Sequence, residues 1–373
     1  MLFSDVAGHD QLKERLIASV KEERISHAQM FLGKEGTGNL PLALAFAGYI
    51  LCINRQDQDA CGTCPSCRKV KNLIHPDLHF VFPVVKKDSG QKAISDNFLA
   101  EWREAILENP YLNQEIWFAK IGLENKQGSI YVDESSEILR KLSLKTFEGE
   151  YKVMIIWMPE RMNVTTSNKL LKILEEPPGK TLFILVSSDS ERILPTILSR
   201  VQLLKVPAVK NEDLISFIGK KFNISSDKSL DISRLARGNI LRACQVAENG
   251  GDSVFHEDYV KLMRLSFGGN MVELIEWVEK LSVMGREKLK NFFEYCLAFT
   301  RENFVKNTGC SDIVFMTSQE DQFSKNFSAF IHENNVMKIT ALFNQAHAHV
   351  SANGYPKIIL LDTALKIRRL LKQ

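Results

Sequence analysis

Four cysteines lie close together in the sequence at a spacing that suits a metal ion. They are Cys52, Cys61, Cys64 and Cys67, a C-x8-C-x2-C-x2-C array. Tetrahedral zinc accepts four thiolates, and C-x2-C spacing lets one tight turn present two sulfurs to one ion. We predict a structural zinc site, because four sulfur ligands leave no open coordination position for catalysis. The alternative is ordinary buried or free cysteines in a reducing compartment. His75 and His79 lie nearby, but we expect His75 to belong to a turn rather than to supply a fifth ligand.

A glycine-rich turn has the spacing of a phosphate-binding loop without its chemical groups. In the motif G-x-x-x-x-G-K-[ST], backbone amides hold the phosphates, the lysine neutralises them and the hydroxyl coordinates magnesium. Gly33, Gly36 and Gly38 supply the glycines here, but Asn39 occupies the lysine position and Leu40 the hydroxyl position. We therefore expect that ATP is not bound productively, although the backbone could hold a phosphate weakly. The alternative is a glycine turn that is unrelated to nucleotide binding.

The other half of an ATPase site is also missing from the sequence. Acidic residues that hold magnesium and orient water are expected where the apolar strand 152–157 ends, but Trp157 and Met158 stand there. Glu160 follows shortly after, and we expect Pro159 to turn it away from the site. The joint loss of the lysine and the acids indicates a chain that does not hydrolyse nucleotide.

A candidate catalytic arginine follows the apolar run 181–186. Arg200 closes the segment Thr196–Arg200, and Ser199 precedes it as a supporting residue. An arginine exposed there can reach the γ-phosphate bound by a neighbouring subunit and stabilise the charge of the transition state, as arginine fingers do. The alternative is a surface or salt-bridged arginine.

The segments that position these residues alternate between strands and helices. An amphipathic helix is expected at 10–22, and another helix after the glycine turn, at 40–52. Three mostly apolar runs have the character of parallel strands buried on both faces. The strand runs are 28–32, 152–157 and 181–186, and a helix with a double-proline stop lies at 166–176. The alternation predicts an α/β fold with a parallel sheet covered on both sides.

After Pro207 the pattern is helical almost throughout. We expect a small helical domain at 208–250, a hinge around Gly250–Asp252 and a further helical region at 254–373, with helices near Met271–Leu281 and Lys288–Phe304. The segment from Lys86 to Gly128 has weak signals, so we place an insertion there that begins with an exposed loop.

Composition limits the class of protein. A chain of 373 residues exceeds one core, so two or three domains are expected. The 48 Lys and Arg against 45 Asp and Glu are too balanced to indicate a nucleic-acid binder through overall charge. Without a long apolar run or a leader-like start, we expect a cytoplasmic location and no membrane partner.

Four stretches together resemble the bacterial clamp-loader subunits of the AAA+ family. They are His27–Gly33, the four-cysteine array, Leu170–Pro178 and Leu194–Arg200. The resemblance covers about residues 1–250. It implies an AAA+, P-loop NTPase-like domain at 1–207 with an inserted zinc module at 52–67, a helical lid at 208–250 and an all-α collar domain at 254–373.

Within this family the resemblance favours the delta-prime branch over the gamma/tau motors, whose ATPase motifs are intact. It implies a subunit of DNA polymerase III without ATPase activity of its own, which sits with gamma/tau and delta subunits in a hetero-pentamer. That ring loads a sliding clamp onto primed DNA in replication, and Arg200 would complete the ATP site of an adjacent motor. Val201 replaces the cysteine of the family's Ser-Arg-Cys motif, and Arg242 stands at a position like that of its second nucleotide sensor.

Two other functions stay open at this point. One is an active gamma/tau-like ATPase motor, which would have to tolerate Asn39 and Leu40. The other is a zinc-dependent nucleic-acid-binding protein. The segment Cys61–Lys71 has no aromatic residue on which a base could stack, which weakens the latter.

Overall fold

The computed structural model describes residues 1–86, 92–122, 128–248, 255–310 and 313–372. These residues form two compact units. The first comprises Met1–Ser229 and Ala236–Cys244, and the second Leu230–Leu235 and Gln245–Gln373. The expected hinge at Gly250–Asp252 and most of the expected loop at Lys86–Gly90 fall outside the described residues.

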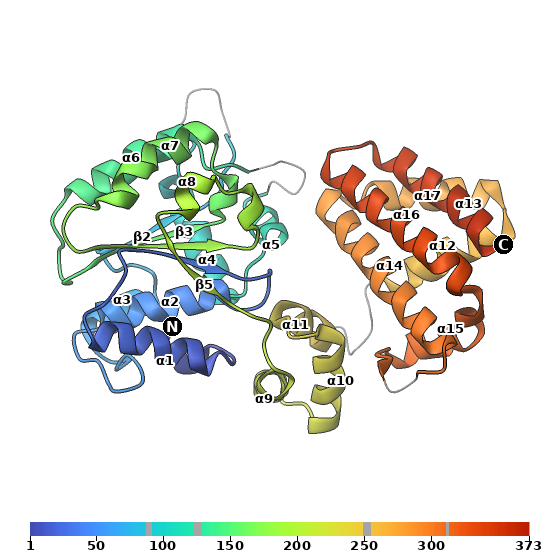
Figure 1. The fold of residues 1–373 in the computed structure, drawn as a ribbon, viewed down its shortest axis with the longest axis horizontal. Coiled ribbons are helices and arrows are strands. Elements are labelled where there is room, and N and C mark those ends of the chain that lie inside the picture. Colours follow the sequence, from blue (N-terminus) through green and yellow to red (C-terminus); the bar gives the residue numbers. More distant parts are fainter. Residues whose placement is uncertain (87–91, 123–127, 249–254, 311–312, 373) are drawn as a thin grey trace. The chain divides into compact units, whose positions relative to one another are not determined.

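A five-stranded parallel sheet forms the centre of the first unit (Figure 1). Its strand order is β2-β3-β4-β1-β5, so β1 lies between β4 and β5 although it comes first in the chain. The strands are β1 Ala28–Leu32, β2 Leu78–Val81, β3 Lys152–Trp157, β4 Thr181–Ser187 and β5 Gln202–Lys205. Because every strand runs the same way, all loops that follow strands lie at one edge of the sheet.

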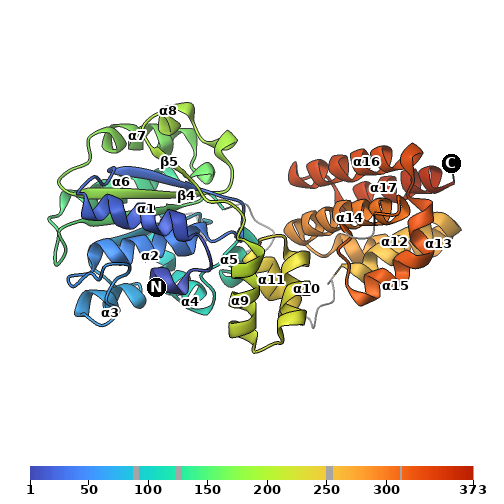
Figure 2. The same cartoon turned by 60° about the horizontal axis from the view of Figure 1, so that its bottom comes forward.

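Helices cover both faces of the sheet, with α1 and α2 on one side and α6 and α7 on the other (Figures 1 and 2). The helices of this region are α1 Asp10–Lys21, α2 Asn39–Leu51, α3 Pro65–Lys71, α4 Leu99–Glu108, α5 Gln114–Lys120, α6 Val132–Ser143, α7 Val164–Glu175, α8 Pro195–Leu198, α9 Asn211–Phe222, α10 Ser226–Ala236 and α11 Ile240–Glu248. Short 3-10 turns are η1 Phe3–Asp5, η2 Ser95–Phe98, η3 Pro159–Arg161 and η4 Ser190–Arg192.

The strand side chains alternate between two cores, as the two-residue period of a strand requires. In β3, Val153 and Ile155 join the core under α2, whereas Met154 and Ile156 join the core under α6 and α7. Both β3 and β4 are buried along their whole length. The near-continuous apolar runs in the sequence are thus explained by burial on both faces.

The structure confirms most of the predicted elements of this unit and adds others. The strands at 28–32, 152–157 and 181–186 and the helices that flank them are present. The sequence reasoning missed β2 and β5. It also missed α4 and α5, which occupy the described part of the expected insertion and bury Trp102 and Trp117 completely. Trp102 lies 4.3 Å from Phe82 and 5.2 Å from Trp157 between ring centroids, so this segment completes the core beside β3.

The described residues after α11 are helical, as predicted. They form α12 His256–Gly268, α13 Met271–Ser282, α14 Arg286–Asn307, α15 Ser318–Phe327, the 3-10 turn η6 Ser328–Phe330, α16 Glu333–Ser351 and α17 Pro356–Leu371. Helices α14 and α16 pack along each other, and α17 packs on α12, α13 and α16. None of the helices in the described ranges combines the length and apolarity needed to cross a bilayer.

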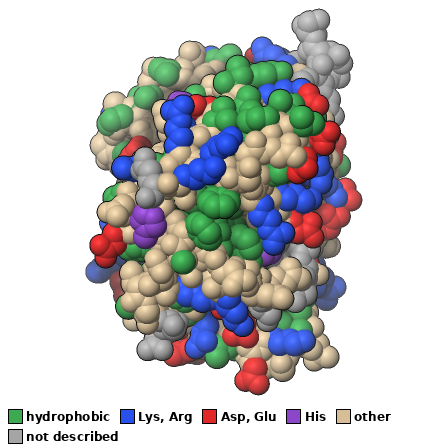
Figure 3. Space-filling model, turned by 90° about the vertical axis from the view of Figure 1, so that its right-hand side faces the viewer, with side chains coloured by type: hydrophobic (Ala, Val, Ile, Leu, Met, Phe, Trp, Pro, Cys, Tyr) green, Lys and Arg blue, Asp and Glu red, His purple; other side chains and the backbone are tan. Residues whose placement is uncertain are grey.

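The second unit exposes large hydrophobic side chains that its own core does not use. On α13, Val272 is 68% and Ile275 47% exposed, and Ile358 on α17 is 66% exposed. Figure 3 shows green hydrophobic patches between blue Lys and Arg side chains on one face of the molecule. Such patches are typical of surfaces that contact other proteins.

Candidate functional site

The glycine-rich turn connects β1 to α2 at the carboxyl edge of the sheet, where a phosphate-binding loop would lie. Gly36 and Gly38 adopt left-handed backbone angles, with φ of 76° and 100°. At Gly36 a side chain is also excluded by space, since a Cβ would lie 2.0 Å from Asn239 Oδ1. Glycine is therefore required at both positions by the backbone, and at Gly36 also by space.

Asn39 fills the cradle of the glycine turn with its own side chain. Its Nδ2 donates to the carbonyl oxygens of Gly33 at 3.0 Å and Ser187 at 3.2 Å, and its Oδ1 accepts from the amide of Leu40 at 3.2 Å. Amides at the start of such a helix are the groups that hold a phosphate. The asparagine thus ties the loop to β4 and satisfies one of these amides internally, and it brings no positive charge.

The remaining chemical groups of an ATPase site are replaced by buried apolar ones. Leu40 is 1% exposed and packs in the core, so no oxygen is available there for magnesium. At the end of β3, Trp157 packs on Trp102 in the same core, and Met158 is 6% exposed. The two positions expected to carry acids therefore contribute to packing instead.

Three further residues hold the loop from outside. Asn239 donates from Nδ2 to the carbonyl oxygen of Glu35 at 2.9 Å, and the amide of Ile240 donates to Gly36 at 2.8 Å. His9 Nε2 lies 2.7 Å from the carbonyl oxygen of Thr37, and because that oxygen can only accept, Nε2 carries the proton. Burial lowers the pKa of His9, which favours the neutral ring. Sequence reasoning did not select these residues.

Glu160 corrects one sequence expectation. Pro159 does not turn it away from the sheet edge, because Glu160 Oε2 accepts from Ser187 Oγ at 2.8 Å and Oε1 from the Ser188 amide and hydroxyl at 3.3 Å. The 3-10 turn η3 folds the carboxyl group back over the end of β4. Burial raises the pKa of Glu160. Both carboxyl oxygens are engaged by serine groups, so the residue braces the edge beside Asn39.

Arg200 lies directly after α8 and is held by a network of acceptors. Its Nε donates to Glu175 Oε1 at 2.6 Å and its Nη2 to the same oxygen, while Nη1 donates to the carbonyl oxygen of Thr196 at 2.9 Å. Ser199 Oγ lies 3.4 Å from Nη1 and is bonded to the same carbonyl. The side chain of Arg200 keeps 30% of its surface exposed. Sequence reasoning selected Arg200 and Ser199 but missed Glu175.

The glycine turn and Arg200 lie at opposite edges of the sheet. The turn follows β1, whereas Arg200 precedes β5, and β1 and β5 pair in parallel with Gln29 opposite Gln202. The five residues of β1 separate the two edges by about 16 Å, at roughly 3.3 Å per residue. Arg200 is therefore out of reach of a phosphate in the chain's own loop, and any phosphate that it meets must be bound by another molecule.

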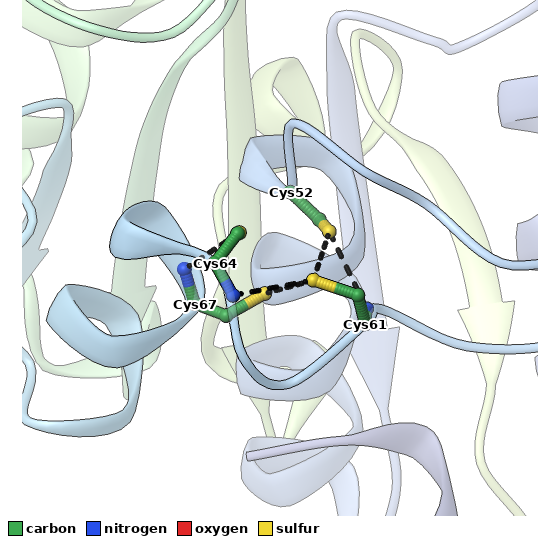
Figure 4. A group of neighbouring side chains, drawn as sticks. All are labelled: Cys52, Cys61, Cys64 and Cys67. Atoms are coloured by element: carbon green, nitrogen blue, oxygen red, sulfur yellow. Dashed lines mark hydrogen bonds between the residues drawn. The ribbon is translucent and has the colours of Figure 1, made fainter.

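The four cysteines converge in one cluster between α2 and α3 (Figure 4). Cys52 follows α2, Cys61 lies in the connecting loop, and Cys64 and Cys67 lie at the start of α3. All four sulfurs lie within 4.8 Å of one another, and Cys61 Sγ is 3.6 Å from Cys52 Sγ and 3.9 Å from Cys67 Sγ. Four sulfurs at about 2.3 Å from a tetrahedral zinc would be about 3.8 Å apart, so the cluster fits such an ion.

Three backbone amides donate hydrogen bonds to sulfurs of the cysteine cluster, which favours the thiolate form of these sulfurs. The amides of Cys61, Cys64 and Cys67 each point at the sulfur of the preceding cysteine, at 3.4 Å. Backbone amides, that of Thr63 above all, lower the pKa of Cys61 to about 6, whereas burial raises the pKa of Cys52 and of Cys67. His75 is not part of the cluster: its Nδ1 accepts from the Asp77 amide at 3.1 Å within a turn, as predicted.

Comparison with known proteins identifies the family. The family model described as DNA polymerase III, delta subunit, matches residues 8–210, which is more than half of the chain. The chain belongs to this family. Several of its relatives are named as the delta-prime subunit of DNA polymerase III. The delta-prime subunit of Bacillus subtilis (strain 168) is 27% identical over 253 residues, which are 67% of this chain and 61% of the relative. The delta-prime subunit of Escherichia coli (strain K12) is 26% identical over 228 residues, 61% of this chain and 56% of the relative.

The match to a tau subunit of DNA polymerase III covers more of the chain at a lower identity. The tau subunit of Bacillus subtilis (strain 168) is 22% identical over an alignment of 386 positions, which covers 98% of this chain and 61% of the relative. The chain thus spans about six tenths of the length of these relatives. The delta-prime family match includes the glycine turn, the cysteine cluster and Arg200, whereas Arg242 lies beyond it, on α11.

Proposed function

We propose that this delta-prime family member is a clamp-loader subunit that does not hydrolyse ATP and that completes the ATP site of a neighbouring subunit with Arg200. One observation carries the proposal. The glycine turn at one sheet edge has its catalytic positions replaced, whereas a held arginine lies at the opposite edge. At the carboxyl edge, Asn39, Leu40 and Trp157 stand at the positions where an ATPase carries its lysine, its magnesium-binding hydroxyl and its acid. At the amino edge a guanidinium is held in place by Glu175 and Thr196.

Arg200 supports a role in trans because of where it lies. The guanidinium belongs to the edge of the sheet that lies about 16 Å from the edge with the chain's own loop, so it can only act on a phosphate bound by another chain. Such an arginine stabilises the charge that develops on the transferred phosphoryl group and is worth about 10³- to 10⁵-fold in rate. Ser199 would support it through the Thr196 carbonyl.

The partners follow from the family. We propose a hetero-pentamer with gamma/tau motor and delta subunits that loads a sliding clamp onto primed DNA. Residues 1–207 would form its AAA+ domain, 208–250 a lid whose Arg242 is a remnant of a nucleotide sensor, and 254–373 the collar. The exposed apolar side chains of α13 and α17 suit such a collar contact. The alternative of an active gamma/tau-like motor is not favoured, since it would need the groups that Asn39, Leu40 and Trp157 replace.

The cysteine cluster would hold one structural zinc ion through Cys52, Cys61, Cys64 and Cys67. The distances between the sulfurs and the amides that point at them support this assignment. A zinc ion with four thiolate ligands supplies folding energy to the short segment between α2 and α3 rather than chemistry.

The experiment that tests the proposal measures a single turnover of ATP in a reconstituted loader. The loader is assembled from this chain and the gamma/tau and delta subunits of the same organism, with clamp and primed DNA. In this assay each active ATP site contributes to a fast burst of hydrolysis. Arg200→Ala should lower the hydrolysis rate at the site next to this chain by about 10³-fold, so the contribution of that site disappears from the burst.

The matched control is Arg192→Ala. Arg192 is also exposed, and it pairs with Asp189 three residues before it on η4. Its replacement should leave the burst unchanged, and circular dichroism of each isolated variant should show an intact fold. A full burst with Arg200→Ala, or ATP hydrolysis by the isolated wild-type chain at the rate of a motor subunit, would refute the proposal.

A further inference from the structure

The side chain of Glu175 makes two contacts with Arg200 that leave one edge of the guanidinium available. Arginine has five N–H donors in a fixed planar arrangement. The Nε and Nη2 donors on one edge both go to Glu175 Oε1, and Nη1 donates to the Thr196 carbonyl at 2.9 Å and to the Ser199 hydroxyl at 3.4 Å. Among the bonds of the described residues, one N–H on Nη2 stays unused, and the bond from Nη1 to Ser199 is the long one. Nη1 and Nη2 form the edge that pairs with two oxygens of a phosphate.

We propose that Glu175 is a positioning residue, which fixes the orientation of Arg200 so that its Nη1–Nη2 edge faces the phosphate bound by the neighbouring subunit. The inference rests on the proposed trans role of Arg200. It assigns a function to the last residue of α7, which is far from Arg200 in sequence and whose carboxylate would not itself touch the nucleotide.

The elements that carry the pair are fixed in one core. Leu174, next to Glu175, and Ile197 on α8 are both completely buried and belong to the core cluster under α6 and α7. The carbonyl oxygen of Leu174 also lies 2.9 Å from His27 Nε2, which ties the end of α7 to the start of β1. A side chain is held precisely enough for catalysis when its anchor belongs to such rigid elements.

The exposure of this ion pair indicates that it orients the Arg200 side chain and contributes little to the stability of the fold. Glu175 is 48% and Arg200 30% exposed, so water screens their attraction, and exposed pairs contribute little to folding. Without the carboxylate, Arg200 would be held by the Thr196 carbonyl and the Ser199 hydroxyl alone and would sample other rotamers. A displacement of about 1 Å of a catalytic group can cost on the order of 10²-fold in rate.

An opposite role would be a lock, in which Glu175 neutralises Arg200 until the ring assembles. The two roles predict opposite effects on rate, because removing a lock accelerates hydrolysis whereas removing an anchor slows it. The arrangement favours the anchor, since the carboxylate occupies the side edge of the guanidinium and leaves the end edge open.

The test compares Glu175→Ala with Glu176→Ala in the reconstituted loader. Glu176 is the next residue, is exposed and carries the same charge, which makes it the matched control. Glu175→Ala should lower the single-turnover rate at the site next to this chain by about 10- to 100-fold, with an unchanged KM for ATP. Glu175→Gln, which keeps an acceptor oxygen, should lie between Glu175→Ala and wild type. Glu176→Ala should match wild type.

A double variant separates positioning from a general structural effect. If Glu175 acts through Arg200, adding Glu175→Ala to Arg200→Ala should slow hydrolysis no further, because coupled residues are non-additive. Equal rates for Glu175→Ala and Glu176→Ala, or a faster rate for Glu175→Ala, would overturn the positioning role while the trans role of Arg200 stands. A full burst with Arg200→Ala would instead remove the basis of both.

Discussion

Replacing Asn39 by alanine tests whether the side chain closes the cradle. The variant loses two hydrogen bonds from Nδ2, to the carbonyl oxygens of Gly33 and Ser187, and the bond that Oδ1 accepts from the Leu40 amide. A neutral intramolecular hydrogen bond contributes about 1 kcal/mol net, and water can reach part of this site. We therefore expect the free energy of unfolding of the first unit to fall by about 2 kcal/mol.

The assay is thermal unfolding followed by circular dichroism, with urea unfolding as a second measure. For a unit of this size 1 kcal/mol corresponds to about 2–4 °C, so Asn39→Ala should lower the first melting transition by about 4–8 °C. Asn168→Ala is the control, because Asn168 is exposed on α7 and alanine favours a helix slightly. An unchanged Tm for Asn39→Ala would show that the three bonds do not close the cradle.

Asn39→Lys extends the same test to nucleotide. A lysine ammonium can still donate to the two carbonyls and adds the missing charge, so we expect ATP binding to increase while hydrolysis stays absent. Leu40 provides no magnesium ligand, and Trp157 provides no acid. Nucleotide binding is measured by titration calorimetry and hydrolysis by phosphate release. Hydrolysis by this single variant at a motor's rate would contradict the reasoning, because it would mean that the other losses do not matter.

Two further predictions concern the parts that support the site. The purified chain should contain one zinc ion, and a strong chelator or Cys64→Ser should increase amide hydrogen exchange across residues 52–67. A metal-free preparation with unchanged exchange there would refute the zinc assignment. Burial alone would raise the pKa of Asp77, but the amides of Phe147, Glu148 and Gly149, at 2.6–2.8 Å, more than offset this and lower it. Because the folded pKa lies below the unfolded value, this stabilisation is complete above about pH 4 and is lost as the pH falls through the folded pKa. Asp77→Asn should thus destabilise the chain by about 2 kcal/mol at pH 7 and by progressively less in acid, measured by urea unfolding. A destabilisation that is independent of pH would refute this account.

The sequence predicts the central strands well because their environment is the simplest one. Strands β3 and β4 are buried on both faces, which demands apolar residues throughout, and their bounds were found to within a residue. Strand β2 is short, lies at the sheet edge and contains His79, and β5 is exposed at three of its four positions, two of which are polar. Neither strand has an apolar run in the sequence that is long enough to distinguish it from a loop.

Some features of the candidate site can be recognised from neighbouring residues in the sequence, whereas others depend on contacts that form only in the folded chain. The spacing of the cysteines and the replacements at Asn39 and Leu40 are local, so the sequence reveals them. The contact between Glu175 and Arg200 is not local, because the residues are 25 positions apart and meet only when α7 and α8 pack on one core. Glu160 was misplaced for a similar reason. The sequence shows the proline before it but not the serines of β4 that draw its carboxyl group back.

Under the proposed function, the parallel sheet explains how the glycine turn can lack catalytic groups while Arg200 on the same domain keeps its role. Asn39, Leu40 and Trp157 change groups at the carboxyl edge, and they replace them by interactions that keep β1, β3 and β4 packed. Arg200 depends on α7, α8 and the start of β5 at the amino edge, where none of these side chains reaches. Asn39 and Arg200 bond to different partners at the two edges, so we expect mutation to change nucleotide binding at the glycine turn and the position of Arg200 separately. Variants at Asn39 should therefore change stability and nucleotide binding of this chain without altering the burst at the neighbouring site.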